Sequence, residues 1–314
     1  MNKKEIKIVI GVCVKKEEKL IIQMLESLSK SIVKSIEYYD FHIVMCANGC
    51  TDNTIPLVQS WIKNNLHLSC GLFELNESNL IEAQRTVIRE AKKNNSKVVI
   101  FFDSDIIVHE DCVSELLKYY FPIEKGIIKV AYAISVPIRR KRVSLIESAT
   151  NLYNTSNIIF SRRKHFQGRA FLIKTDVWDV PETGSQLIVD DIYLSLYIRS
   201  KFESNSIMEI STAKVYFYQI RTYVDLYNTF RRTKIEILKC LLLFPEFKVI
   251  SDVSVYRKII WKNLLKEPIH NIFLCLYLLF IRKIVALQFK FEIMFTKSNK
   301  ENQWKVTKTS KSMI

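Results

Sequence analysis

The first hundred residues alternate between short apolar runs and amphipathic segments. Residues 6–14, 41–47 and 97–102 are almost wholly apolar, which predicts strands buried on both faces, and residues 69–75 predict a weaker strand. Residues 17–32, a segment ending near Trp61, and residues 79–93 carry apolar side chains at helical spacing. Fully apolar strands that alternate with helices are typical of a parallel sheet covered on both sides. The pattern therefore predicts an α/β fold with an open, mostly parallel, twisted sheet flanked by helices.

The pattern is less regular after residue 105. It predicts a helix at 109–120, strands at 127–138, 165–178 and 213–220, and helices at 144–160, 187–198 and 223–244. The segment after Pro268 is the most apolar in the chain, but its uncharged part ends at Arg282 and Lys283. That length is short of the ~20 residues that a membrane-spanning helix needs. Two interpretations stay open: a helix packed inside the protein, or an interfacial helix at an anionic membrane surface.

Composition narrows the classes of protein without choosing one. The 314 residues are 48% hydrophobic, enough for a large core, and the formal net charge of +15 favours anionic partners such as nucleic acid, acidic lipid or a phosphorylated small molecule. Seven cysteines without a C-x-x-C pair argue against a disulfide framework or zinc site and favour a reducing cytoplasm. The first apolar run is short and followed at once by charges, so it indicates a strand rather than a secretion signal. Neither G-x-G-x-x-G nor G-K-[ST] occurs.

A pair of carboxylates directly follows the fourth predicted strand. Asp103 and Asp105 are one residue apart, so in an extended segment their side chains point the same way. Ligands of open α/β sheets bind beyond the carboxyl ends of the strands. Two hard oxygen donors at that place suit Mg²⁺ or Mn²⁺. The alternative is that the two aspartates only cap the helix predicted at 109–120.

Five motifs occur in an order that resembles a known family. They are VIGVCVKKEEKL, HIVMCANGCTDNT, VVIFFDSD, QGRAFLIKTDVW with VDDIYLS, and TYVDLYNTFRRTKIEI. Over residues 6–240 the chain resembles an inverting family 2 glycosyltransferase with a GT-A-type fold. The resemblance implies a catalytic domain at 1–245, with a nucleotide-sugar half of about 1–125 and an acceptor half of about 126–245. Residues 246–314 would then form a helical, apolar and basic extension.

The resemblance also implies roles for individual residues. Asp105 and Asp103 would hold Mg²⁺ or Mn²⁺, and Gly168 would leave room for the acceptor, although a simple strand glycine is the alternative. The residues expected at the nucleotide sugar are Cys13, Val14, Glu17, Asn48, Arg85, Asp103, Ser104, Arg231 and Arg232. Asn48 stands where an aspartate is common, which changes the hydrogen bonds offered to the base. A solvated surface arginine is the alternative for Arg85.

Asp191 is the expected general base, with Asp190 as its acidic partner. Inverting transfer requires a carboxylate that takes the proton of the acceptor hydroxyl. The alternative is that one of these aspartates caps the helix predicted at 187–198.

The expected function is a metal-dependent, non-processive transfer of one sugar from a nucleotide-sugar donor, by family frequency a UDP-sugar, to a hydroxyl acceptor. The family's Q-x-x-R-W pattern lacks its tryptophan here, which argues against a processive enzyme. Surface-glycan or glycolipid assembly at the cytoplasmic face of the cell membrane is the expected setting. The alternatives are a nucleic-acid-binding protein, suggested by the charge, and a non-catalytic membrane scaffold. The basic clusters at 139–142 and 162–164 can line a phosphorylated acceptor, touch a membrane or simply be solvated.

Overall fold

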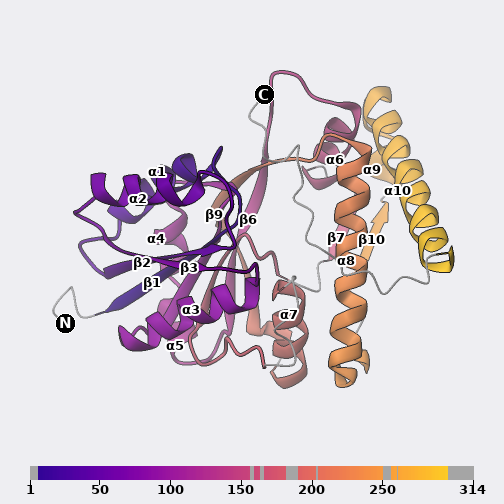
Figure 1. Ribbon diagram of the computed structural model, residues 1–314. Coiled ribbons are helices and arrows are strands. Elements are labelled where there is room, and N and C mark those ends of the chain that lie inside the picture. The colour runs from indigo at the N-terminus through magenta and orange to yellow at the C-terminus, as the bar shows by residue number, and fades with distance from the viewer. Residues whose placement is uncertain are drawn as a thin grey trace. The chain divides into compact units, whose positions relative to one another are not determined.

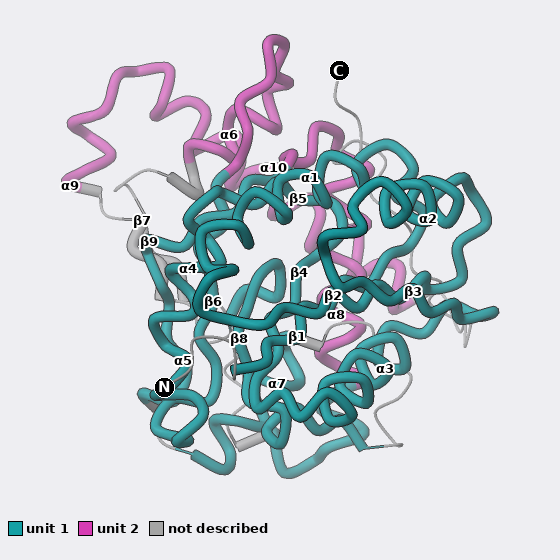
Figure 2. The backbone as a smooth tube through the Cα atoms, turned by 90° about the vertical axis from the view of Figure 1, so that its left-hand side faces the viewer, with its two compact units in different colours: residues 1–136, 165–217, 240–251 teal, residues 137–164, 218–239, 252–314 magenta. Residues whose placement is uncertain are grey.

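The computed structural model describes residues 6–155, 159–162, 166–181, 190–202, 204–249, 256–259 and 261–295. The chain forms two compact units that interleave along the sequence (Figure 2). Unit 1 comprises residues 1–136, 165–217 and 240–251, and unit 2 comprises residues 137–164, 218–239 and 252–314. The division at residue 245 that the sequence suggests stays a prediction. Each unit is described by itself.

The first half of unit 1 is the parallel part of an eight-stranded sheet (Figure 1). Its strands stand in the order β3-β2-β1-β4 and pair in parallel. The bounds are β1 (Lys7–Val14), β2 (Asp40–Asn48), β3 (Ser69–Leu75) and β4 (Val98–Asp103). The connecting helices are α1 (Ile21–Val33), α2 (Thr54–Asn64) and α3 (Leu80–Lys93). These elements confirm the alternation predicted from the apolar runs.

Strand β1 shows why its sequence is apolar throughout. Ile8, Ile10 and Val12 are fully buried in the core that α1 also fills. On the opposite face, a Cβ at Gly11 would lie 2.4 Å from Cγ1 of Val87 on α3. Glycine is therefore required at residue 11 for α3 to pack this closely on the sheet.

The second half of the sheet is antiparallel and was not predicted as such. The strand order continues from β4 with β8 (Ala170–Lys174), β6 (Val130–Ile138), β9 (Ile207–Tyr218) and β5 (Ile106–Val108). The pairings β4–β8, β6–β8 and β5–β9 are all antiparallel. The helix predicted at 109–120 is instead two short helices, α4 (Cys112–Leu117) and α5 (Tyr120–Glu124). Helix α7 (Asp190–Lys201) follows β8 along the chain, and two 3-10 turns lie at Ser204–Ser206 and Pro245–Val249. The sheet is thus mixed, and the predicted α/β class is confirmed.

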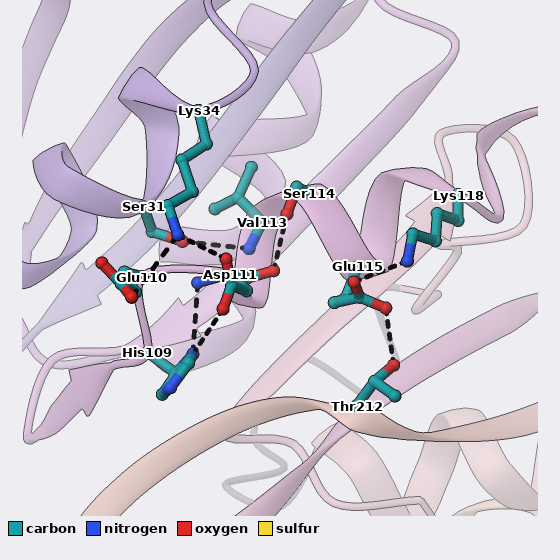
Figure 3. A network of polar contacts seen from close by, with 10 residues as sticks. All are labelled: Ser31, Lys34, His109, Glu110, Asp111, Val113, Ser114, Glu115, Lys118 and Thr212. Carbon is teal, nitrogen blue, oxygen red and sulfur yellow. Dashed lines mark hydrogen bonds and ion pairs between the residues drawn. The ribbon is translucent and has the colours of Figure 1, made fainter.

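Polar contacts hold the segment after β4 on helix α1 (Figure 3). The hydroxyl of Ser31 accepts a hydrogen bond from Val113 N over 3.0 Å, and Ser27 accepts one from Val108 N over 2.9 Å. Lys34 Nζ lies 2.5 Å from Asp111 Oδ1, and this hydrogen bond lowers the pKa of the exposed Asp111 carboxyl. These contacts fix β5 and α4 against α1. The turn at Asp103–Asp105 therefore lies between β4 on one side and the anchored β5 on the other.

Unit 2 is built mainly from helices. They are α6 (Leu145–Thr155), most of α8 (Tyr223–Leu243), the short α9 (Trp261–Leu264) and α10 (Ile269–Phe295). Strand β7 (Ile159–Arg162) pairs antiparallel with β10 (Tyr256–Ile259). The helix predicted at 144–160 therefore ends earlier, because residues 159–162 join this two-stranded sheet.

Unit 2 also contains a buried cluster of charges. The Glu147 side chain is fully buried, and its Oε1 accepts a hydrogen bond of 2.9 Å from Arg140. Arg221 approaches the other oxygen of the same carboxylate at 3.4 Å. Arg140 also donates to the carbonyl of Gln219 over 2.9 Å. Part of the basic cluster at 139–142 is therefore structural rather than solvated.

Candidate functional site

The carboxyl ends of the parallel strands bring several of the predicted site residues to one edge of the sheet. Cys13 of β1 is paired with Cys46 of β2 and with Asp103 of β4. Val14 ends β1, and Asn48 ends β2 beside Leu75 of β3. The residues expected to contact the nucleotide sugar thus start from neighbouring strands, as parallel pairing requires.

The D-S-D motif forms the link between β4 and β5. Asp103 is exposed at the last position of β4, Ser104 is buried, and Asp105 is half-buried in the turn before β5. The alternative that these aspartates cap the next helix is wrong, because α4 begins at Cys112 and its N-cap residue is Asp111. Helix capping therefore does not explain why Asp103 and Asp105 stand at the end of β4.

A short segment connects the D-S-D motif to Asp191. The carbonyl of Arg169 accepts a hydrogen bond of 2.9 Å from Asp103 N. The preceding residue, Gly168, donates its N–H to Asp191 Oδ2 over 3.3 Å. Two consecutive residues therefore contact both acidic positions, and Asp191 lies at the same end of the sheet as Asp103.

Helix α7 fixes the position of Asp191. Ser195 donates to the Asp191 carbonyl over 2.6 Å and accepts from Phe166 N over 3.1 Å, so the first turn of α7 is tied to the strand segment. Asp190 and Asp191 are the first two residues of α7, where the helix dipole favours carboxylates. Both aspartates lie inside α7 rather than at the cap position before it. The role of Asp191 as base stays a prediction.

Gly168 has a local reason to be glycine. A Cβ at this position would lie 3.2 Å from Cβ of Asp191 and 3.5 Å from its Oδ2. Glycine therefore permits the close approach of the Asp191 side chain. Its predicted contribution to the acceptor site stays a prediction.

Asn48 is oriented by the start of helix α3. The side chain is 1% exposed, and its Oδ1 accepts a hydrogen bond of 2.6 Å from the N–H of Asn79, the N-cap residue of α3. The amide nitrogen of Asn48 has no acceptor within the described part of the chain. An aspartate here would offer a second oxygen, whereas Asn48 offers a hydrogen-bond donor.

Glu17 lies in a loop that is bonded to the neighbouring loop. Its N–H donates to Thr54 Oγ1 over 2.8 Å, and its side chain is buried. Glu18 N donates to Asp52 Oδ2 over 3.4 Å, and Asn53 N donates to Glu18 Oε2 over 3.1 Å. The loops after β1 and β2 are thus joined where a nucleotide is expected to bind.

The three arginines assigned from the sequence have structural contacts. Arg85 is not a solvated surface arginine: its guanidinium donates to the carbonyl of Val180 over 2.8 Å and to Glu82 over 3.3 Å. Arg231 and Arg232 belong to unit 2. There, Arg231 Nε donates to Glu292 Oε1 over 2.6 Å. Their predicted roles at the diphosphate stay predictions.

Two cations near the edge were missed in the sequence. Lys15 directly follows β1 and is half-buried, and burial, followed by the charge of Lys16, lowers the pKa of its ammonium group. The guanidinium of Arg169 lies 3.9 Å from the ring centre of Phe217, and the backbone carbonyl of the same residue accepts the hydrogen bond from Asp103 N. In the sequence, the pair Lys15-Lys16 directly after a strand and the pair Gly168-Arg169 could have indicated these two cations.

The acidic residues at this edge could contribute only part of a metal shell. Within the described ranges, no group of three or more His, Cys, Asp and Glu side chains is placed to hold a metal ion. Asp103 and Asp105 offer carboxylate oxygens, the donors that Mg²⁺ and Mn²⁺ prefer. Water and oxygens of a bound substrate are ligands that could add to these carboxylates.

Comparison with known proteins decides the family. The profile of "Glycosyl transferase family 2" matches residues 9–180, more than half of the chain. The chain belongs to glycosyl transferase family 2. This confirms the predicted family and its class of enzyme. No curated protein sequence matches the chain significantly.

Three solved structures are similar to the chain. The mannosyltransferase PcManGT from Pyrobaculum calidifontis, solved with GDP-Man and Mn²⁺, has a TM-score of 0.55 and 14% identity, over 79% of this chain and 65% of that chain. This chain therefore spans less than two thirds of PcManGT. Glucosyl-3-phosphoglycerate synthase from Mycobacterium tuberculosis, solved with Mn²⁺, UDP and phosphoglyceric acid, has a TM-score of 0.49 and 15% identity, over 81% and 87%. TarS of S. aureus has a TM-score of 0.47 and 17% identity, over 77% and 43%. The likeness to PcManGT confirms the predicted GT-A-type fold.

Proposed function

We propose that this family 2 glycosyltransferase moves one sugar from a nucleotide-sugar donor to a hydroxyl acceptor with inversion. The observation that supports the proposal most strongly is the connection between the two acidic positions. Residues 168 and 169 contact Asp191 and Asp103 respectively, so a donor held at the D-S-D motif is close to a carboxylate base.

In this mechanism Asp191 removes the proton from the acceptor hydroxyl as its oxygen attacks the anomeric carbon. The bond to the donor's diphosphate breaks on the opposite side of that carbon, which inverts its configuration. The Gly168 N–H donates to Asp191 Oδ2, so it helps to orient the carboxylate. Asp190, one residue earlier, is the acidic partner in the pair.

The donor is expected to lie across the ends of β1, β2 and β4. Asn48 would offer its amide nitrogen to the base, and the loop around Glu17 would border the ribose. Asp103 and Asp105 would hold Mg²⁺ or Mn²⁺, which supplies positive charge for the departing diphosphate when bound. Lys15 and Arg169 add cations near the same edge. A UDP-sugar is the first donor to test.

A thermal-shift panel of nucleotide sugars, each with and without Mn²⁺ or Mg²⁺, tests the proposal. We expect one donor to raise the melting temperature only when the metal is present, and to release its nucleoside diphosphate. Asp105→Ala should abolish both effects. The matched control is Asp176→Ala, because Asp176 is an exposed aspartate that pairs with Lys174, and Lys174 lies at the far end of the β4–β8 pair. If no donor binds, or if Asp105→Ala behaves like Asp176→Ala, the proposed reaction is wrong.

The proposed setting is surface-glycan or glycolipid assembly on the cytoplasmic side of the cell membrane. Its support is a surface of unit 2 that is both apolar and flanked by positive charge.

A further inference from the structure

Exposed apolar side chains concentrate along one side of helix α10. Eight large apolar side chains of this helix are at least 47% exposed. Seven of them, all except Ile293, recur at intervals of four, three, four, seven, four and three residues. This spacing returns to the same side of a helix with 3.6 residues per turn. We call this side the outer face: Ile269, Phe273, Leu276, Phe280, Leu287, Phe291 and Met294.

The opposite side of α10 packs against the other helices of unit 2. Cys275 and Leu278 are buried in a cluster with Ala149 of α6, and Val285 is buried with Ile146 and Leu226. Near the end of the helix, Tyr227 and Arg231 of α8 both bond to Glu292. Figure 1 shows α10 lying alongside α6 and α8 within this unit. Because protein covers one side, only the outer face is available to another surface.

The positive charge of the chain resides in the same unit. Unit 2 contains 24 of the 47 lysines and arginines but only 7 of the 32 aspartates and glutamates, so its net charge is +17. The remaining residues, 23 basic and 25 acidic, give unit 1 a net charge of −2. A second copy would bring another strongly positive unit 2 to this face. An anionic surface is the complementary partner.

Two exposed lysines border the apolar stripe. Lys283 falls between Phe280 and Leu287, and Lys290 precedes Phe291. The 19 residues that follow α10 contain five lysines and one glutamate in sequence. Lysine stems can lie along an apolar surface while their ammonium groups reach lipid phosphates. The arrangement matches a helix that lies in the plane of a bilayer interface.

By length and composition alone, Ile269–Met294 is a helix that could cross a membrane, and it is the one such helix among the described residues. Crossing would place Lys283 near the middle of the hydrocarbon and Glu292 with its α8 partners inside the bilayer. Charged groups at the bilayer centre are costly. Lying in the plane avoids this cost, because Lys283 and Lys290 can both reach the head groups.

We propose that the outer face of α10 docks this protein, as a peripheral protein, on the interface of an anionic lipid bilayer. Its apolar side chains enter the head-group boundary, while Lys283 and Lys290 contact lipid phosphates. This docking goes beyond the proposed reaction and does not depend on catalysis.

Vesicle co-sedimentation of the full chain tests the docking. We expect binding to vesicles of phosphatidylcholine mixed with phosphatidylglycerol, much weaker binding to phosphatidylcholine alone, and release at high salt. Phe273→Glu with Phe280→Glu should lower the vesicle partition coefficient at least tenfold. Lys283→Gln with Lys290→Gln should lower it roughly fivefold per lysine. Phe121→Glu is the matched control, since Phe121 is an exposed phenylalanine of unit 1 and should not affect binding.

Four outcomes would overturn the docking proposal. One is wild-type protein that ignores anionic vesicles, and another is unchanged binding by the folded Phe273→Glu, Phe280→Glu variant. Retention after alkaline carbonate extraction would indicate a spanning helix. A dimer by light scattering that the same variant converts to a monomer would assign the face to a second copy. Asp105→Ala should keep its vesicle binding, which separates this test from that of the proposed reaction.

Discussion

The substitution Gly168→Ala tests whether the position of the Asp191 carboxylate matters for catalysis. The new Cβ would lie 3.2 Å from Cβ of Asp191 and 3.5 Å from its carboxylate carbon. Asp191 must therefore shift by a few tenths of an ångström, and its 3.3 Å hydrogen bond from Gly168 N weakens or breaks. The φ angle of Gly168 is outside the left-handed range, so alanine adds no backbone strain.

Two opposing contributions keep the change in the free energy of unfolding of Gly168→Ala small. Loss of a hydrogen bond to a charged group costs about 1.5 kcal/mol or more, and this long bond belongs at the low end. Replacing glycine by alanine restricts the unfolded chain and returns about 0.4–1 kcal/mol. We therefore expect a free energy of unfolding within about 1 kcal/mol of wild type. The rate responds more strongly, because a misplacement of ~1 Å can cost about a hundredfold. A shift of a few tenths of an ångström is expected to lower kcat roughly tenfold.

The assay follows nucleoside diphosphate release with the donor that the thermal-shift panel identifies. We expect Gly168→Ala to lower kcat with little change in donor binding, and Asp191→Asn to lower it by at least about a hundredfold. Gly71→Ala is the matched control. A Cβ at Gly71 would also meet a neighbouring atom at 3.2 Å, but that atom is Cε2 of the Phe73 ring, and Gly71 lies within β3, the outermost strand on the parallel side of the sheet.

Two results would refute the assignment of Asp191. If Asp191→Asn retains wild-type kcat, Asp191 is not the base. If Gly168→Ala retains full kcat although a structure of the variant shows the carboxylate displaced, its placement does not control the reaction.

Four further predictions concern stability and thiol chemistry. Gly11→Ala should lower the free energy of unfolding by about 1–3 kcal/mol in urea titrations, because its Cβ would lie 2.4 Å from Val87 Cγ1; an unchanged midpoint would contradict the close α3 packing. Glu147→Gln should lower the free energy of unfolding by about 3 kcal/mol or more, measured by thermal denaturation, because it leaves the buried Arg140 without its charged partner. A variant as stable as wild type would show that Arg140 pairs with another acidic group. Asn48→Ala should lower the free energy of unfolding by about 1–3 kcal/mol, because it removes the acceptor for Asn79 N. Asn48→Asp keeps an oxygen at that position and should lower the free energy of unfolding by less. Equal losses in the two variants would argue against that hydrogen bond. Burial raises the pKa of Cys46 to about 11 and of Cys112 to about 12, so both should react with Ellman's reagent at pH 8 only after denaturation; rapid reaction of either in the native protein would contradict its burial.

The parallel half of the sheet was predictable because its signals are local. Residues 69–75 form a strand with the predicted bounds, and the helix expected at 79–93 is observed at Leu80–Lys93. The position of Asp103 at the end of β4 followed from the same apolar run. Each of these elements depends on a few consecutive side chains that alternate or repeat at a fixed period.

The antiparallel half was not predictable in this way. Strand β8 inserts between β4 and β6, and the short β5 pairs with β9 about a hundred residues away. The predicted helix at 144–160 ends at Thr155, since residues 159–162 pair with 256–259. No local periodicity encodes which distant strand a segment will join.

The sequence by itself determined the family motifs, the alternation of strands and helices in the first hundred residues and the presence of an apolar final helix, because these depend on residue type and short spacing. Only the tertiary structure decided that Gly168 and Arg169 join Asp191 to Asp103, since Gly168 and Asp191 are 23 residues apart and come from different elements. It also decided which side of α10 is covered. Both sides of that helix are apolar, so the pattern alone leaves them equivalent, and contacts with α6 and α8 remove one side from solvent and leave the other exposed.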